Sequence, residues 1–315
     1  MRHWLKLGVA AMTALALLAA CGDGKGSETL PDATIAFFSD RDSSVATYFA
    51  VYLMKGDGSE QTRLTDGQAR DYWPVWSPDG SKIAFTSERD GYRAVYVMNA
   101  DGSEQTALTS GPAWDYWSSW SPDGSKIAFV SGAGDAAEVL VMNADGSNPI
   151  NLTNNAGTDL SPVWSPDGSK IAFTSERDGN SEIYVMNADG SGQTNLTNDP
   201  AEEYWSTWSP DGSKIAFVRR LGADGEANDE VFVMNADGSD PINLTNNAAL
   251  DYSPIWSPDG SKIAFTSERD GNAEVYLMNA DGSAPTNISK NPATDMANSW
   301  LPRPASSATP GADGS

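Results

Sequence analysis

Histidine and cysteine are almost absent from this chain of 315 residues, which contains one of each, His3 and Cys21. Residues 1–20 have the layout of a secretory signal, because Arg2 and Lys6 precede an uncharged apolar run, and we expect this segment to be removed. The mature chain would then lack imidazole. Ser-His-Asp triads, Cys-His pairs and histidine-ligated zinc sites are thereby excluded, so we expect a protein that is not an enzyme.

Basic residues are also scarce. The chain has 20 lysines and arginines against 43 aspartates and glutamates, a formal net charge of −23. Nucleic acid would be repelled by this field and is not an expected partner. With 39% hydrophobic residues the chain is nevertheless able to bury a core, so it is not a disordered polyanion.

The apolar run ends in Leu18-Ala19-Ala20-Cys21, which resembles the bacterial lipobox. The resemblance implies an exported lipoprotein, held on the periplasmic or cell-surface side of a bacterial membrane by lipid on Cys21 alone. Residues 21–33 would then be a lipidated linker. The alternative is a chance cysteine after an ordinary signal.

The sequence WSPDGSKIAF occurs five times, starting at Trp76, Trp120, Trp164, Trp208 and Trp256, and a sixth Trp300 opens a different sequence. One unit, residues 159–199, contains four short apolar runs separated by SPDG, ERDGNS and NADG, which predicts four antiparallel strands. The second run, Ile-Ala-Phe, is apolar without alternation, so both faces of each sheet must be covered. A period of 44 to 48 residues with these features predicts a β-propeller.

The two ends of the repeat array complement each other. The first unit begins at Ile35 without a tryptophan strand, and no second strand follows Trp300. We therefore predict that a strand around residues 297–301 completes the blade that begins at residue 35, which makes an all-β, six-bladed propeller over residues 34–302. Residues 303–315 are rich in proline, alanine and serine and are expected to be a disordered tail.

WSPDGSKIAFTSERDGNSEIYVMNADGSGQTNLT resembles the WD-like repeat of TolB-type six-bladed propellers, over residues 34–302. The resemblance implies a propeller that serves as a periplasmic binding partner, an enzyme companion or a carbohydrate-associated domain. We expect the chain to be a monomer. The six repeated tryptophans are assigned to packing, because they follow the scaffold and not any one site.

An acidic residue lies five positions before each of the six tryptophans. We expect these residues to ring the mouth of the central channel, where they would bind calcium or a basic partner segment. The alternative is structural pairing with arginines of the same face, of which four occur in Asp-Arg-Asp or Glu-Arg-Asp sequences, Arg41, Arg89, Arg177 and Arg269. The six acids are Asp71, Asp115, Asp159, Glu203, Asp251 and Asp295.

Aromatic residues follow these acids in four of the six units. They would serve either as anchors for a protein or a sugar ring, or as packing between blades. The set is Tyr72, Trp73, Tyr116, Trp117, Tyr204, Trp205 and Tyr252, together with Trp114, which directly precedes Asp115.

These features favour a non-catalytic envelope lipoprotein whose acidic and aromatic face binds an envelope protein or polysaccharide. One alternative is a carbohydrate-active or carbohydrate-binding propeller that uses its carboxylates. Another is an accessory propeller to a separate hydrolase. No cofactor other than calcium is expected.

Overall fold

The computed structural model describes residues 33–42, 48–222 and 228–302. The expected signal segment, the lipid attachment at Cys21, most of the linker and the tail after residue 302 lie outside the described residues. Within them, the one helix is a 3-10 turn at Gly134–Ala136. No helix in this part of the chain is long and apolar enough to cross a membrane.

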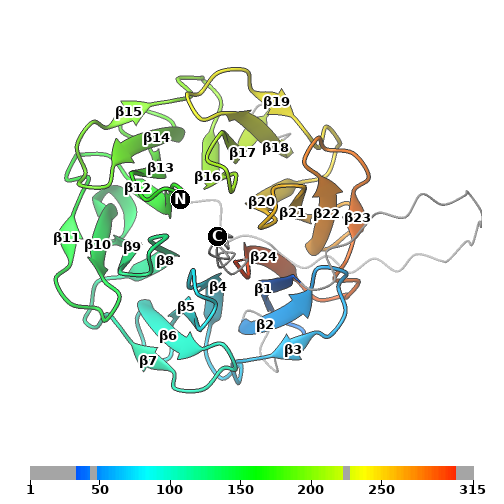
Figure 1. Cartoon of the computed structure of the whole chain (residues 1–315), viewed down its shortest axis with the longest axis horizontal. Coiled ribbons are helices and arrows are strands. Elements are labelled where there is room, and N and C mark those ends of the chain that lie inside the picture. The colour runs from blue at the N-terminus through cyan, green and yellow to red at the C-terminus, as the bar shows by residue number, and fades with distance from the viewer. Residues whose placement is uncertain (1–32, 43–47, 223–227, 303–315) are drawn as a thin grey trace, which may run out of the picture.

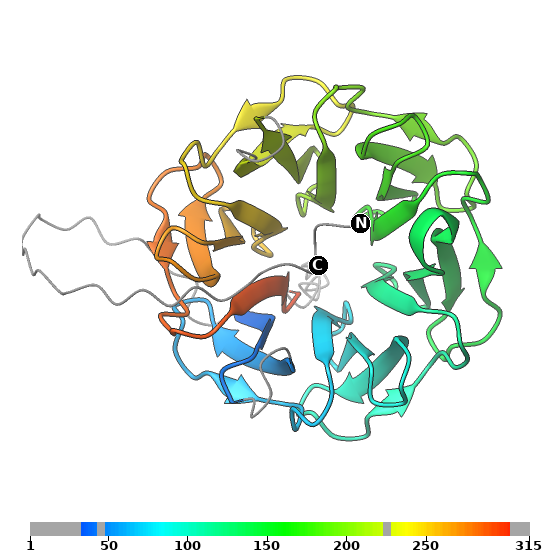
Figure 2. The same cartoon turned by 180° about the vertical axis from the view of Figure 1, so that it is seen from behind.

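Six four-stranded antiparallel sheets surround a central axis, as Figures 1 and 2 show from opposite ends. The sheet that contains the earliest strand is made of β24 (Asp295–Trp300), β1 (Thr34–Ser39), β2 (Ala50–Lys55) and β3 (Thr62–Arg63). The second has β4 (Asp71–Trp76), β5 (Lys82–Ser87), β6 (Ala94–Asn99) and β7 (Thr106–Ala107). The third has β8 (Asp115–Trp120), β9 (Lys126–Ser131), β10 (Glu138–Asn143) and β11 (Ile150–Asn151).

The other three sheets follow the same order from the axis outward. The fourth has β12 (Asp159–Trp164), β13 (Lys170–Ser175), β14 (Glu182–Asn187) and β15 (Thr194–Asn195). The fifth has β16 (Glu203–Trp208), β17 (Lys214–Leu221), β18 (Asn228–Asn235) and β19 (Ile242–Asn243). The sixth has β20 (Asp251–Trp256), β21 (Lys262–Ser267), β22 (Glu274–Asn279) and β23 (Thr286–Asn287). We number the blades in this order, and the predicted six-bladed propeller is confirmed.

The ring closes as the sequence predicts. β24 pairs antiparallel with β1, with Trp300 opposite Ile35. The backbone N–H of Leu301 donates to the carbonyl of Thr34 at 2.6 Å, which reproduces the bond from Ser77 to Lys82 that closes the corresponding hairpin in blade 2. Two segments from opposite ends of the described chain thus form one ordinary hairpin without a covalent turn.

The hydrophobic core lies between blades and not in one central mass. Between blades 3 and 4, for example, Val141 and Ala128 pack against Phe173 and Trp164. The Ile-Ala-Phe strands have no exposed surface in five blades and almost none in blade 3, because each is covered on both sides by a neighbouring sheet. Five of the six repeated tryptophans are buried and Trp120 is partly buried, in agreement with their assignment to packing.

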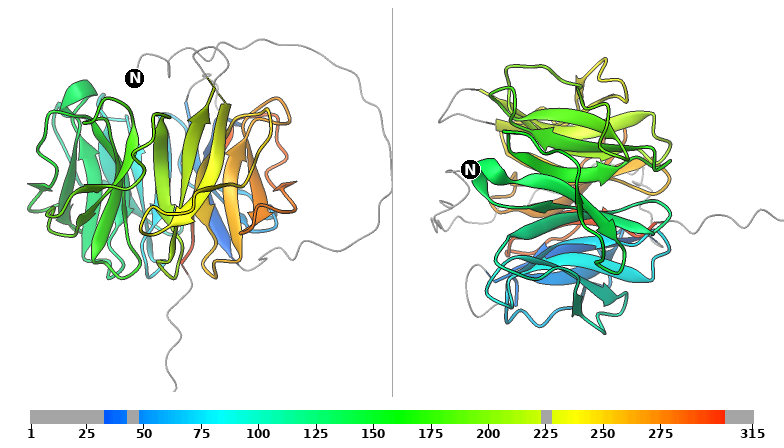
Figure 3. Two further views of the ribbon diagram at one scale, coloured as in Figure 1. Left: turned by 90° about the horizontal axis from the view of Figure 1, so that it is seen from above. Right: turned by 90° about the vertical axis from the view of Figure 1, so that its left-hand side faces the viewer.

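The two ends of the propeller differ in character, and Figure 3 shows both in side view. One end, here called the turn end, contains the SPDG and NADG turns. There the glycine of one SPDG turn faces the proline of the turn before it, so that a Cβ added at Gly168 would lie 3.6 Å from Pro122. At the closure, Gly80 meets Leu301 in place of a proline. The other end, the loop end, contains the variable connections, and every inner strand runs from the loop end to the turn end.

Candidate functional site: the central channel

A bulge in the inner strands points particular side chains toward the axis. In blade 2, Tyr72 pairs with Thr86 and Val75 pairs with Ala84, so Trp73 and Pro74 lie opposite the single residue Phe85. Such a bulge adds one residue and reorients the side chain next to it. The third residue of the strand takes a left-handed backbone conformation in five blades, at Trp73, Trp117, Ser161, Trp205 and Ser253.

The six inner strands enclose a hollow of about 150 Å³, and each contributes to its wall. Three indoles lie on this wall, Trp73 and Trp117 on neighbouring blades and Trp205 two blades further on. The remaining lining residues are aliphatic or carry hydroxyl or amide groups. None of the lining residues is charged.

The residues that line the channel alternate from one blade to the next, although the ten-residue motif is the same in five blades. The fourth and fifth residues of the inner strand are proline and an aliphatic residue in blades 2, 4 and 6, and two polar residues in blades 1, 3 and 5. In blades 1 and 3 the hydroxyl at the fifth position accepts a hydrogen bond from the backbone N–H of the next blade's tryptophan, Trp76 to Ser299 at 3.3 Å and Trp164 to Ser119 at 3.4 Å.

The hydroxyls at the fourth position behave differently. Ser118 Oγ and Ser206 Oγ are buried and have no hydrogen-bond partner among the described residues. Both residues line the channel. The equivalent side chain in blade 1, Asn298, donates from Nδ2 to the carbonyl of Pro74 at 2.8 Å.

The six acids do not form an exposed collar at the channel mouth. Each is the first residue of an inner strand, and five have no exposed surface, while Asp115 is 7% exposed. None lines the channel. Among the described residues, no group of three or more acidic, histidine or cysteine side chains lies close enough together to hold a metal ion. The predicted calcium ion therefore finds no shared ligand set in this part of the chain.

Five of the six acids pair with an arginine of their own blade, which is the structural alternative. The pairs are Asp71 with Arg89 at 3.2 Å, Asp159 with Arg177 at 3.1 Å, Asp251 with Arg269 at 3.1 Å, Asp295 with Arg41 at 2.6 Å, and Glu203 with Arg219 at 2.6 Å. Arg219 belongs to none of the four motifs noted in the sequence. It occupies the register position that a serine has in the other blades, opposite the acid.

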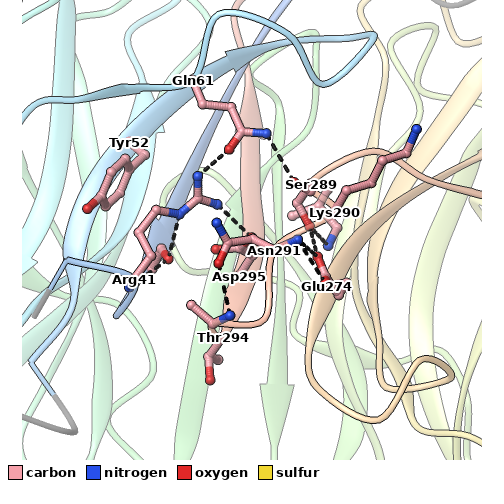
Figure 4. A network of polar contacts seen from close by, with 12 residues as sticks. Arg41, Tyr52, Gln61, Glu274, Ser289, Lys290, Asn291, Thr294 and Asp295 are labelled. Atoms are coloured by element: carbon pink, nitrogen blue, oxygen red, sulfur yellow. Dashed lines mark hydrogen bonds and ion pairs between the residues drawn. The ribbon is translucent and has the colours of Figure 1, made fainter. Parts of the chain in front are cut away.

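Three of these arginines, Arg41, Arg89 and Arg177, reach from the acid of the inner strand to a glutamine beside the outermost strand. Figure 4 shows Arg41, which binds Asp295 of β24 and Gln61 beside β3. Its guanidinium also lies 5.1 Å from the ring centroid of Tyr52 in β2. The guanidinium of Arg41 thus contacts the carboxylate of Asp295, the side-chain amide of Gln61 and the ring of Tyr52. These contacts stabilise the blade, and the charges of Arg41 and Asp295 neutralise each other instead of binding a ligand.

Asp115 in blade 3 is the exception, since no arginine is paired with it among the described residues. Hydroxyls of Ser131 and Thr109 hydrogen-bond to its carboxyl, but burial is the larger effect and raises its pKa. The sequence SGAGDAAE replaces the arginine motif in this blade and forms the 3-10 turn. Asp115 is therefore the acid of the six whose burial is not offset by an arginine among the described residues.

We predict opposite outcomes for the same substitution in blades 3 and 4. Asp159→Asn breaks a buried ion pair whose arginine is partly exposed, and should lower the free energy of unfolding by about 2 kcal/mol. Asp115→Asn should be neutral or stabilising at neutral pH. Because the pKa of Asp115 is higher in the folded than in the unfolded chain, the free energy of unfolding of the wild type falls as the pH rises above about 4. An uncharged amide at this position does not show that fall. Denaturant unfolding of both variants from pH 4 to 7 measures the difference, and equal destabilisation would contradict the account.

The aromatic set divides by position. Tyr72, Tyr116, Tyr204 and Tyr252 are buried between blades, and burial raises the pKa of each phenol, that of Tyr116 to about 12. These tyrosines are packing residues. Trp73, Trp117 and Trp205 are partly buried and line the channel. Trp114 is 45% exposed, lies outside the channel, and has the guanidinium of Arg93 4.6 Å from its ring centroid.

Comparison with known proteins agrees with this architecture. The family model described as the TolB β-propeller domain matches residues 30–139, 112–226 and 206–308. The chain belongs to the TolB β-propeller family. No curated protein is similar enough in sequence to count as a relative. Like other members, it has a fold suited to a scaffold or binding role.

Several solved structures resemble this chain at low sequence identity. TolB from Acinetobacter baumannii is 24% identical with a TM-score of 0.78, over 87% of this chain and 68% of that one. A putative TolB from Agrobacterium tumefaciens is 24% identical with a TM-score of 0.59, over 72% and 95%. An oligogalacturonate lyase from Vibrio parahaemolyticus is 20% identical with a TM-score of 0.54, over 77% and 73%. At these identities the likeness concerns the fold alone.

Proposed function

We propose that this TolB-family propeller is a non-catalytic binding module that captures its ligand at the central channel through Trp73, Trp117 and Trp205. The observation that carries the proposal is the placement of three indoles on an uncharged channel wall. Each of these tryptophans has a backbone φ between 52° and 54°, where a bulky residue is strained. Ser161 and Ser253 have the same conformation in blades 4 and 6, so the bulge belongs to the scaffold, and the indole is what distinguishes this position in blades 2, 3 and 5.

In this proposal the ligand contacts the three indoles and not the six carboxylates. Rigid aromatic side chains supply large contact areas at low entropic cost and are common anchors in recognition sites. The acids support the scaffold, since five of them are in ion pairs and all six are buried or nearly so.

A carboxylate-dependent glycosidase is less well supported. Two carboxyl groups about 5 to 10 Å apart must flank the scissile bond in such enzymes. The channel wall contains no carboxyl group. Together with the lack of histidine after His3, this favours binding without turnover.

We also propose that the propeller acts at a bacterial envelope as a lipoprotein, with the lipid on Cys21, and that its partner is an envelope protein or polymer. The support is the lipobox-like sequence. Mass spectrometry of the purified chain from a bacterial host should find a lipidated Cys21 as the first residue. Metabolic labelling of Cys21→Ser with a fatty-acid analogue should find none.

The channel site is tested on an array that carries neutral glycans, acidic glycans and synthetic peptides. Three single variants, Trp73→Ser, Trp117→Ser and Trp205→Ser, place at each bulge the residue that blades 4 and 6 already have there. Each should weaken the wild-type signal by tenfold or more, about 1.4 kcal/mol, while thermal unfolding stays cooperative. Trp114→Ser is the matched control outside the channel and should keep the signal. Loss of binding in Trp114→Ser alone would place the site elsewhere.

A further inference from the structure

We infer that blade 3 contains a binding slot for an arginine side chain of a partner polypeptide, with Asp115 as the carboxylate that receives the guanidinium. This inference goes beyond the proposed function, because the slot lies at the loop end of one blade and not in the channel. It is carried by the five other blades, in each of which the equivalent acid binds an arginine of the chain itself.

The other blades show which groups such a slot offers to a guanidinium. In blade 4, Arg177 donates from Nη2 to Asp159 at 3.1 Å and from Nε to the hydroxyl of Ser175 at 2.7 Å. The guanidinium carbon of Arg177 lies 5.5 Å from the ring centroid of Phe173. Blades 1, 2 and 6 repeat this arrangement. A carboxylate, a hydroxyl and an aromatic ring therefore define the slot.

Blade 3 keeps these three groups without the arginine. Asp115 and Ser131 lie opposite each other in the ladder, as the acid and the serine do in blade 4. Phe129 lies two residues before Ser131 on β9, which is the place of the aromatic residue in blade 4. The following loop has the same length in both blades, SGAGDAAE against SERDGNSE, and Ala133 stands where the arginine does. The side chain that fills the slot elsewhere is thus reduced to a methyl group.

The slot in blade 3 is open to solvent. Asp115 is 7% exposed, whereas the other five acids have no exposed surface. Ser131 is only partly buried, whereas the equivalent serines of blades 1, 2, 4 and 6 are buried almost completely. Ala133 itself is exposed. The acid and the serine thus gain exposed surface in the blade that lacks the arginine, so a side chain from outside can reach them.

Charge and shape select arginine among the basic side chains. Hydroxyls of Ser131 and Thr109 hydrogen-bond to the carboxyl of Asp115, but its burial still raises its pKa, which a nearby cation would counteract. The formal charge of −23 attracts a basic segment of a partner toward the chain. A planar guanidinium donates to a carboxylate and a hydroxyl at once while it lies against a ring, an arrangement that the compact ammonium group of lysine does not reproduce.

The test is an NMR titration with the capped peptide acetyl-Gly-Arg-Gly-amide, and with lysine or citrulline in place of the arginine as comparators. Citrulline has nearly the shape of arginine but no charge. At pH 7 the arginine peptide should shift the backbone amide signals of Asp115 and Ser131 in a saturable way, and both comparators should bind at least about tenfold more weakly. Binding should also weaken at pH 4, because a larger fraction of Asp115 is then protonated.

Two variants act on the slot, and both are expected to fold. Asp115→Asn removes the charge and should raise the dissociation constant of the arginine peptide by about tenfold or more. Ala133→Arg supplies the arginine within the blade, so it should raise the melting temperature by about 2 °C and abolish the shifts caused by the peptide. Ala136→Arg places the same charge three residues further along the loop. It is the matched control, and should leave the melting temperature unchanged and the dissociation constant within about twofold.

Several outcomes would overturn the inference. Equal binding of the arginine and citrulline peptides would mean that the carboxylate is not used. Binding that persists in both Asp115→Asn and Ala133→Arg would place the peptide elsewhere on the acidic surface. If the arginine peptide causes no saturable shift, or if Ala133→Arg melts no higher than Ala136→Arg, the slot does not receive a guanidinium. None of these outcomes concerns the channel, which the array measurement tests separately.

Discussion

A chain that ends at Thr294 is expected to lose cooperative folding. It lacks β24, so β1 loses its inner partner and the first blade keeps three strands. The deletion also removes Trp300, which is 6% exposed, from a cluster that joins blades 1 and 6. Loss of one such side chain costs about 3–5 kcal/mol, a large part of the 5–15 kcal/mol that stabilises a typical domain. Circular dichroism during heating should show a broad, low transition.

A circular permutant is the matched control for this deletion. Its new ends lie in the connection between β23 and β24, and a Ser-Pro-Asp-Gly-Ser linker joins Trp300 to Thr34, as Trp76 is joined to Lys82. Because Leu301 and Thr34 already form the hydrogen bond of that hairpin, the permutant should fold with at least wild-type stability. A permutant that unfolds, or a truncated chain as stable as wild type, would show that the closing strand is not required.

Gly58→Ala is expected to be the most destabilising glycine substitution in the turns. Gly58 has a φ of +82°, and a Cβ there would lie 1.9 Å from the carbonyl oxygen of Ile288 in blade 6. The neighbour is backbone and cannot swing away, so blades 1 and 6 would have to separate. The free energy of unfolding should fall by about 3 kcal/mol or more.

Gly91→Ala separates the clash from the backbone strain. Gly91 has a φ of +85°, and nothing lies within 4 Å of the position of its Cβ. The free energy of unfolding of this variant should fall by only about 1 kcal/mol, which is the cost of an alanine in a left-handed conformation. Urea denaturation of both variants gives the difference. Equal losses would mean that the blades tolerate the contact and that closure is looser than the structure indicates.

The architecture was predictable because the repeat is nearly perfect. Five identical decapeptides fix the hairpin between the first two strands, and the incomplete units at Ile35 and Trp300 predict the closure. The bulge was not predictable, because the letters of DYWPVW do not show that Trp73 and Pro74 lie opposite one residue. An extended strand would place Trp73 on the opposite face from Tyr72 but would not turn it into the channel.

The prediction for the acids was wrong in orientation, for a related reason. The sequence pattern predicts Asp71 at the channel mouth, whereas Asp71 is the first residue of β4, has no exposed surface and pairs with Ser87 in the ladder. A carboxylate buried at that position needs hydrogen-bond donors, which an arginine supplies in five blades and two hydroxyls supply to Asp115. Arg219 was missed because β17 carries its arginine at the serine position of the ladder. An alignment of all six units by strand register would have revealed it.

The central claim is that indoles of the channel, and not the acids around it, hold the ligand. The most direct measurement compares two triple variants for binding to the strongest wild-type ligand of the array. One is Trp73→Ser, Trp117→Ser, Trp205→Ser, and the other is Asp71→Asn, Asp159→Asn, Asp251→Asn. The account predicts that the tryptophan variant loses at least about a hundredfold in affinity, whereas the aspartate variant, studied below its lower melting temperature, binds within about twofold of wild type. Retention of affinity in the tryptophan variant with loss in the folded aspartate variant would contradict it.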